Sequence, residues 1–338
     1  MAYFKFEFSF GNGKKNKANA SSEYVKDGWN FVNEEVEKLR KEKRFKTASN
    51  YLTAARSWTK FASSEKWSFA QMTSSKMEQY QRWLSERGIC LNTISAYMRS
   101  LRVLYNRATA MNTDHLQQTS VTKSAFDKVF TSRAKARKRS ISEEEIQQLN
   151  RLSLPEHSGL SLARDIFMFS FYAMGMPFVD VAYLKKNQVS EHTIHYARHK
   201  TGQAIEVAIL PPMRKIMEKY NHSDSEYVFP ILSAKHRPES VSSQELSEAI
   251  HHQYLNSLRR YNYSLHHLSE KMGLPHPLSS YVVRHSWASI AYLHHVDVEL
   301  IGKALGHTKS STTLLYIKNL FDSDLAKTNL ALMSELGL

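Results

Sequence analysis

Three side chains near the end of the chain could together break a phosphodiester bond. Arg284 lies in the segment Tyr-Val-Val-Arg-His-Ser-Trp, His307 follows 23 residues later in Leu-Gly-His, and Tyr316 comes nine residues after His307. A guanidinium can donate two parallel hydrogen bonds to the non-bridging oxygens of a phosphate, and a histidine can donate another. The phenol of Tyr316 could then attack the phosphorus.

A tyrosine nucleophile needs particular surroundings. A phenol has a pKa of about 10, so at neutral pH it attacks poorly unless its proton is removed or its phenolate is stabilised. The attack also builds negative charge on the phosphate, and the leaving 5′ oxygen must be protonated. The site therefore requires cationic hydrogen-bond donors, which Arg284 and His307 provide, and a general acid.

The Leu-Gly-His segment, with a tyrosine nine residues after the histidine, resembles the C-terminal box of the tyrosine recombinase (phage integrase) family. This resemblance is what singles out Tyr316 among the 17 tyrosines of the chain. Tyr281 and Arg284 stand where the family usually shows H-x-x-R, and a tyrosine there points to the Bacteroides-type branch of integrases and invertases. Tyr281 can hydrogen-bond a phosphate but cannot carry the charge of an imidazolium.

The resemblance implies roles for two further residues. Lys200, in Arg-His-Lys-Thr-Gly, takes the place of a turn lysine that acts as general acid to the leaving hydroxyl, and an ordinary exposed turn lysine is the alternative. Asp180, five residues after Gly175, takes the place of an acidic residue that supports the site. A helix-capping or salt-bridged aspartate is the alternative there.

One arginine of the family pattern is missing. The family's first arginine follows the glycine of G-x-R-x-x-[E/D], or precedes the glycine in some relatives, whereas residues 173–180 read A-M-G-M-P-F-V-D. One guanidinium for the phosphate is therefore unaccounted for. Either another cation supplies it, with Arg164 and Arg198 as candidates, or the protein is catalytically impaired, or the sequence carries an altered residue.

The positive charge of the chain is concentrated in its first part. The net charge is +14, yet residues 1–140 hold 27 Lys and Arg against 12 Asp and Glu, and the rest is close to neutral. This asymmetry predicts a polyanionic partner bound mainly by the N-terminal part, with a solvated basic surface as the alternative. The single cysteine, Cys90, excludes an internal disulfide framework and suits a reducing cytosol, so a cytoplasmic, nucleoid-associated protein is expected.

Hydrophobic periodicity predicts two domains. Residues 1–21 are expected to form a strand-like arm and a basic tether, 22–111 a helical domain, 112–140 a basic linker and 141–338 a second, mostly helical domain. Within the second domain, alternating residues at 193–197 and 204–208 predict a β-hairpin that turns at or near Gly202.

Two basic features are expected to contact DNA. In the helix predicted after its N-cap Asn92, the apolar residues recur at spacings of three and four, and the opposite face carries Ser95, Arg99, Arg102 and Asn106. A solvated outer face is the alternative. The linker ends in a second cluster, Arg137, Lys138 and Arg139, for which a nuclear-localisation tract is the competing interpretation.

The expected fold is mainly α with a small antiparallel β-sheet: a two-domain DNA clamp made of a helical core-binding (SAM-like) domain and a mixed α/β catalytic domain. The resemblance implies a site-specific recombinase of a mobile element that integrates, excises or inverts double-stranded DNA through a 3′-phosphotyrosyl intermediate. Its implied partners are specific recombination sites, three further copies of itself in a tetrameric synapse, and accessory DNA-bending proteins, with no cofactor or metal. The alternatives are a catalytically impaired DNA-binding relative and a type IB topoisomerase.

Overall fold

The computed structural model describes residues 27–110, 125–132, 140–221, 225–233, 242–307, 311–314, 317 and 333. The chain forms two compact units, Met1–Ala136 and Arg137–Leu338. The expected arm and tether at 1–21 lie outside the described residues, as do the basic cluster Arg137, Lys138 and Arg139 and the expected nucleophile Tyr316. None of the described helices is both long and apolar enough to cross a membrane.

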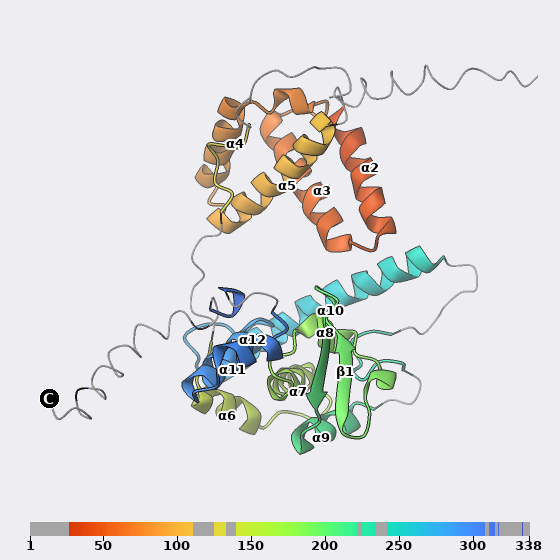
Figure 1. Cartoon of the computed structure of the whole chain (residues 1–338), viewed down its shortest axis with the longest axis vertical. Coiled ribbons are helices and arrows are strands. Elements are labelled where there is room, and N and C mark those ends of the chain that lie inside the picture. The colour runs from red at the N-terminus through yellow and green to blue at the C-terminus, as the bar shows by residue number, and fades with distance from the viewer. Residues whose placement is uncertain are drawn as a thin grey trace, which may run out of the picture. The chain divides into compact units, whose positions relative to one another are not determined.

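Helices build the described part of the N-terminal unit: α2 (Gly28–Lys41), α3 (Phe45–Ala62), the short 3-10 turn η1 (Phe69–Gln71), α4 (Ser74–Glu86) and α5 (Leu91–Ala110) (Figure 1). As the helical period predicts, Ile94, Met98 and Leu101 on α5 are fully buried. They pack in one core with Trp58 of α3 and Tyr80 of α4.

Two sequence expectations for this unit are wrong. Helix α5 begins at Leu91, so Asn92 lies in its first turn and is not its N-cap. Residues 125–132 are not a linker, because Ala125, Phe126 and Val129 are buried in the N-terminal core. This segment forms turns and contributes only three apolar side chains to a core made by other elements. It therefore shows no helical or strand period.

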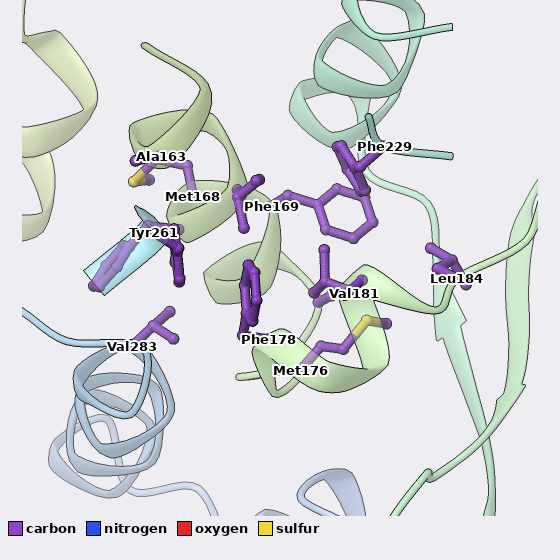
Figure 2. Packing of buried hydrophobic residues seen from close by; sticks show 14 of the residues in the cluster. Ala163, Met168, Phe169, Met176, Phe178, Val181, Leu184, Phe229, Tyr261 and Val283 are labelled. Carbon is purple, nitrogen blue, oxygen red and sulfur yellow. The ribbon is translucent and has the colours of Figure 1, made fainter. Parts of the chain in front are cut away.

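The second unit contains α6 (Glu143–Arg151), α7 (Gly159–Tyr172), α8 (Phe178–Ala182), η3 (Lys186–Gln188), β1 (Thr193–Ala197), β2 (Ala204–Ala208), α9 (Pro211–Lys219), α10 (Ser243–Lys271), α11 (Val282–Leu293) and α12 (Val298–Ala304). Helix α7 is the central element, since it packs against α6, α8, α9, α10 and α11 (Figure 1). Figure 2 shows the buried side chains around it, with Phe169 of α7 near Phe178 and Val181 of α8.

The predicted β-hairpin is confirmed. Strands β1 and β2 pair antiparallel with Ile194 opposite Val207, and these two side chains are buried in the core. The turn contains Gly202, which has a φ of +71° and donates its N–H to the carbonyl of Arg198 at 2.7 Å. The described fold is thus mostly helical with one small two-stranded antiparallel sheet, as expected from the sequence.

A buried ionic network joins α7 to α9. Asp165 of α7 accepts hydrogen bonds from Lys219 Nζ at 2.6 Å, Tyr220 OH at 2.8 Å and Arg164 Nε at 2.9 Å. Burial raises the pKa of Asp165, but the three donors together lower it by more than burial raises it, so the net shift is downward. A carboxyl with a lowered pKa stabilises the fold at neutral pH and loses this effect in acid, as the pH falls through its folded-state pKa.

We expect Asp165→Asn to lower the free energy of unfolding at pH 7 by about 3 kcal/mol, because it leaves two partly buried cationic donors, Lys219 and Arg164, without their charge partner. Denaturant unfolding followed by circular dichroism measures this loss. The control is Glu206→Gln, since Glu206 is 65% exposed and faces His195 across the hairpin at 3.5 Å. Its stability should match the wild type, and equal losses in the two variants would contradict the role given to Asp165.

Candidate active site

A pocket of ≈ 320 Å³ opens in the second unit. Segments far apart in the sequence form it: the start of α8, the turn of the β-hairpin, α10, the start of α11 and the Gly-His segment after α12. The expected site residues Lys200, Tyr281, Arg284 and His307 all line this pocket. The three described cations in its wall are Arg198, Lys200 and Arg284, and no carboxylate is among its described lining residues.

Arg284 is held in a fixed orientation at the base of the pocket. It lies in the first turn of α11 and is 4% exposed. Its Nη1 donates to the carbonyl of Gly175 at 3.0 Å, and its Nη2 donates to the carbonyl of Leu305. Gly175 has a φ of +72°, and a Cβ there would lie 3.1 Å from Arg284 Cα. Both the backbone conformation and the close approach therefore require glycine.

The hydrogen-bond partners of His307 assign its tautomer. Arg284 Nη2 lies 3.2 Å from His307 Nε2, and a guanidinium can only donate, so Nε2 accepts. The ring proton is then on Nδ1, which donates to Thr313 Oγ1 at 3.0 Å. Burial, with the nearby Arg284, Arg198 and Lys200, lowers the pKa of His307 to about 4. In the free protein His307 is therefore neutral at pH 7, and its Nε2 carries a lone pair. The expectation that His307 is a cationic donor is thus wrong for the free protein, because burial and three neighbouring cations disfavour its protonation.

This lowered pKa has a testable effect on stability. An unfolded histidine takes up a proton near pH 6.5, whereas His307 in the folded protein does so only near pH 4. Its contribution is therefore complete above pH 6.5 and is lost as the pH falls between these values. We expect the denaturation midpoint to fall less from pH 7 to pH 5 in His307→Gln than in the wild type. Equal falls in the two proteins would contradict a depressed pKa.

Thr313 is a site residue that the sequence reasoning did not assign. Its side chain is fully buried, and its hydroxyl holds His307 in place. A Cβ at Gly302 would lie 2.8 Å from Thr313 Oγ1, so glycine at that position makes room for the hydroxyl. The pair Thr312-Thr313 is visible in the sequence, but only the structure, in which 311–314 are helical, shows that Thr313 faces His307.

Of the two candidates for the missing arginine, only Arg198 lies in the pocket. It follows β1 and is 8% exposed. Arg164 is engaged elsewhere, since it binds Asp165 and the carbonyl of Leu152. Arg198 Nε lies 3.5 Å from Oδ2 of Asp180, a distance at which the two groups attract but do not hydrogen-bond.

Asp180 is salt-bridged, which was the alternative interpretation of this residue, and it also borders the site through Arg198. Its Oδ1 accepts the backbone N–H of His199 at 2.9 Å. Burial raises the pKa of Asp180, and this effect outweighs the lowering by the His199 hydrogen bond and by Arg198 and Arg284. Asp180 thus connects α8 to the end of the hairpin that carries Lys200.

The remaining expected residues differ in how they are placed. Tyr281 is 52% exposed at the rim of the pocket, and Lys200 is exposed on the hairpin turn beside it. Of the residues that flank Tyr316 in the sequence, Thr312 lines the pocket and Ile317 is fully buried against α11 and α12 residues. Tyr316 itself lies outside the described residues.

Two profiles of known protein families match this chain. Residues 139–322 match the profile described as "Phage integrase family", and residues 29–124 match the "Phage integrase SAM-like domain". The first match alone spans more than half of the chain. The chain belongs to the phage integrase family.

Solved structures of XerH recombinase and of lambda integrase share the fold of this integrase-family chain. XerH site-specific recombinase bound to a palindromic difH substrate, in a post-cleavage complex, is 13% identical, with 95% of this chain and 90% of that chain covered and a TM-score of 0.63. A lambda integrase tetramer bound to a Holliday junction is 13% identical, with 91% and 82% covered and a TM-score of 0.57. No curated protein matches the sequence.

The integrase-family pattern also shows what replaces its first arginine in the sequence. In the register set by Gly175 and Asp180, the arginine of G-x-R-x-x-[E/D] falls on Pro177. Pro177 precedes the first residue of α8 and lines the pocket, whereas Met176 beside it is buried in the core (Figure 2). Pro177 therefore presents its ring to the pocket at the position where the family pattern has an arginine.

The proposed DNA-contacting face of α5, within the SAM-like domain, is only partly as expected. Ser95 is fully buried, so its place on the outer face was predicted wrongly. It lies beside Ile94 and Met98 at the edge of the apolar face, where helical spacing alone does not distinguish buried from exposed positions. Arg99 is half-buried and donates to the Ser95 carbonyl at 3.2 Å, while Arg102 and Asn106 are exposed.

We expect the double variant Arg99→Ala, Arg102→Ala to weaken DNA binding and to reduce the slope of log K against log salt by about two, one for each lost phosphate contact. Fluorescence anisotropy at several salt concentrations measures both quantities. Arg40→Ala is the matched control, because Arg40 belongs to the same unit and pairs with Glu37 at 2.7 Å. A double variant with the wild-type slope would place the DNA on another face.

Proposed function

We propose that this phage-integrase-family protein is a site-specific DNA recombinase of the Bacteroides-type branch, cutting DNA through a 3′-phosphotyrosyl intermediate. One observation carries the proposal: Arg284, His307 and Lys200, from three separate segments, line a single pocket without a carboxylate in its described wall. Such a pocket attracts an anion. The Bacteroides-type assignment rests on Tyr281, which lines the pocket where most of the family has histidine.

In the proposed reaction, a scissile phosphate enters the pocket and takes over the hydrogen bonds of Arg284 that Leu305 and His307 accept in the free protein. The phenol of Tyr316 attacks the phosphorus, and the bond to the 5′ oxygen breaks. Lys200 protonates this leaving oxygen, and the lone pair on His307 Nε2 accepts the phenolic proton. The imidazolium so formed then donates to the phosphate, whose charge is greatest in the transition state.

Rejoining is the reverse of cleavage. A 5′-hydroxyl of a partner strand attacks the phosphotyrosine, so the energy of the phosphodiester bond is conserved and no nucleotide hydrolysis is required. Exchange between strands needs two paired sites, and we propose a tetramer of this chain in the synapse. The lambda integrase tetramer on a Holliday junction supports this proposal through a shared fold.

Because side chains supply all the charge in this mechanism, we expect recombination between two cognate sites to continue at an undiminished rate in excess EDTA and without ATP. Duplexes taken from the DNA that flanks the protein's own gene serve as substrates, and the exchanged products are separated on gels. Loss of cleavage in chelator, restored by a divalent cation, would contradict the mechanism.

The presence of Pro177 at the place of an arginine favours a second candidate, a catalytically impaired relative that binds DNA without cutting it. Such a protein would show the same salt-dependent DNA binding. It would yield no recombinant product in the same assay. Specific binding together with product formation excludes it.

A further inference from the structure

The pocket contains a second buried guanidinium, that of Arg198, which the sequence offers only as one of two candidates for the missing arginine. Arg198 Nη1 donates to the carbonyl of Leu305 and, at 3.3 Å, to that of Gly306. Arg284 Nη2 donates to the same carbonyl of Leu305. The two guanidinium groups, one from the residue after β1 and one from α11, therefore converge on one oxygen atom of the pocket.

Their positive charges outnumber the carboxylates that the described part of the pocket places near them. Two guanidinium groups lie side by side in a buried site, with Lys200 at the rim. Among the described residues, Asp180 is the carboxylate that pairs with Arg198, at 3.5 Å. Bringing like charges together away from water is costly unless a counter-charge is present. A phosphodiester has one negative charge, and gains another as the phenol attacks, so it would complete this site.

The donors of Arg198 are arranged to serve such a ligand. Asp180 faces Nε on one side, and the Leu305 and Gly306 carbonyls hold Nη1. No described residue accepts a hydrogen bond from Nη2, and Arg198 lines the pocket. Gly306, with a φ of +63°, permits this packing, because a Cβ there would lie 2.7 Å from Arg198 Cδ.

We propose that Arg198 is a catalytic residue that, together with Arg284, binds the non-bridging oxygens of the scissile phosphate, and that Asp180 positions it. The hairpin then carries both Arg198 and Lys200 into the site, and the arginine absent at Pro177 is supplied from a different element. This inference rests on the proposed strand cleavage.

The test compares Arg198→Gln with the wild type in single-turnover cleavage of two duplexes. One has a normal scissile phosphate, and the other has a neutral methylphosphonate there, in either stereoisomer. On normal DNA we expect the variant to be slower by about 10²- to 10³-fold. The neutral linkage needs less cationic stabilisation than the charged one. Arg198→Gln should therefore cleave methylphosphonate DNA faster than normal DNA by roughly tenfold or more, the effect expected when one charged donor has been lost.

A purely structural role for Arg198 predicts a different result. If it only held the Leu305–Gly306 turn, Arg198→Gln would cleave the neutral DNA no better than normal DNA, which would overturn the proposal. Arg164→Gln is the matched control, because Arg164 also binds a carboxylate and a carbonyl but lies outside the pocket. It should cleave normal DNA like the wild type.

Two further arms separate folding and function. If Arg198→Gln does not fold, Arg198→Lys takes its place, because lysine keeps the positive charge but loses the two-pronged donor geometry of arginine. The ratio of its cleavage rate on neutral DNA to that on normal DNA should be higher than the wild-type ratio. An unchanged ratio would overturn the proposal. Failure of the wild type to cleave normal DNA that it binds would instead overturn the proposed function itself.

Discussion

Replacing Arg284 with glutamine is expected to slow DNA strand cleavage by about 10³-fold or more, because the variant loses a buried cationic fork directed at the charge that develops on the phosphate. Glutamine can still donate one hydrogen bond but carries no charge. The rate is measured in single turnover, with protein in excess over a nicked duplex, so that weaker DNA binding does not mask the chemical step.

Two companion variants sharpen this prediction. Arg284→Lys should be nearly as slow as Arg284→Gln, since a lysine cannot donate to the carbonyls of Gly175 and Leu305 and to a phosphate in the same geometry. Arg259→Gln is the control, because Arg259 is exposed on α10 and bonds only to Asn256 at 3.0 Å among the described residues. If Arg284→Gln cleaved DNA within roughly tenfold of the wild-type rate, the loss would be too small for a donor to the transition state, and Arg284 would have no part in the mechanism.

The substitution Tyr316→Phe should abolish strand cleavage completely while leaving DNA affinity unchanged. The phenylalanine keeps the aromatic ring but has no oxygen to attack the phosphorus. Gel-shift titration measures affinity, and denaturing gels measure cleavage of the same duplex.

An exposed tyrosine serves as the control for this substitution. Tyr263 is 68% exposed on α10 and stacks edge-on against His267, and it does not line the pocket. Tyr263→Phe should cleave at the wild-type rate. Residual cleavage by Tyr316→Phe, at a rate comparable to this control, would show that another residue is the nucleophile.

Hydrophobic periodicity was enough to predict the helices and strands in which it extends over the whole element. Helix α5 and the β-hairpin were predicted correctly because their apolar residues recur at spacings of three and four, or alternate, over their whole length. The segment 125–132 has no such period, since Phe126 and its neighbours fill a core that other helices build. Ser95 was misplaced because it lies at the boundary of the buried face, where a single step of helical spacing decides burial.

The same distinction applies to the site. Arg284 and His307 could be predicted because each belongs to a short motif, and the structure places both in one pocket. The contact of Arg198 with Leu305 joins residues 107 apart in the sequence, and no local motif encodes it. The neutral state of His307 depends on burial and on three neighbouring cations, two from the hairpin turn and one from α11, which only the folded chain brings together.

Trapping the covalent intermediate tests the central claim most directly. Wild-type protein is incubated with suicide duplexes, cut from the flanks of its own gene and shown to be bound, in which a nick lets the released 5′-hydroxyl fragment diffuse away. The account predicts a protein–DNA adduct that survives denaturation, with the 3′-phosphate attached to the peptide that contains Tyr316. Bound DNA without an adduct, or an adduct on a different residue, would contradict it.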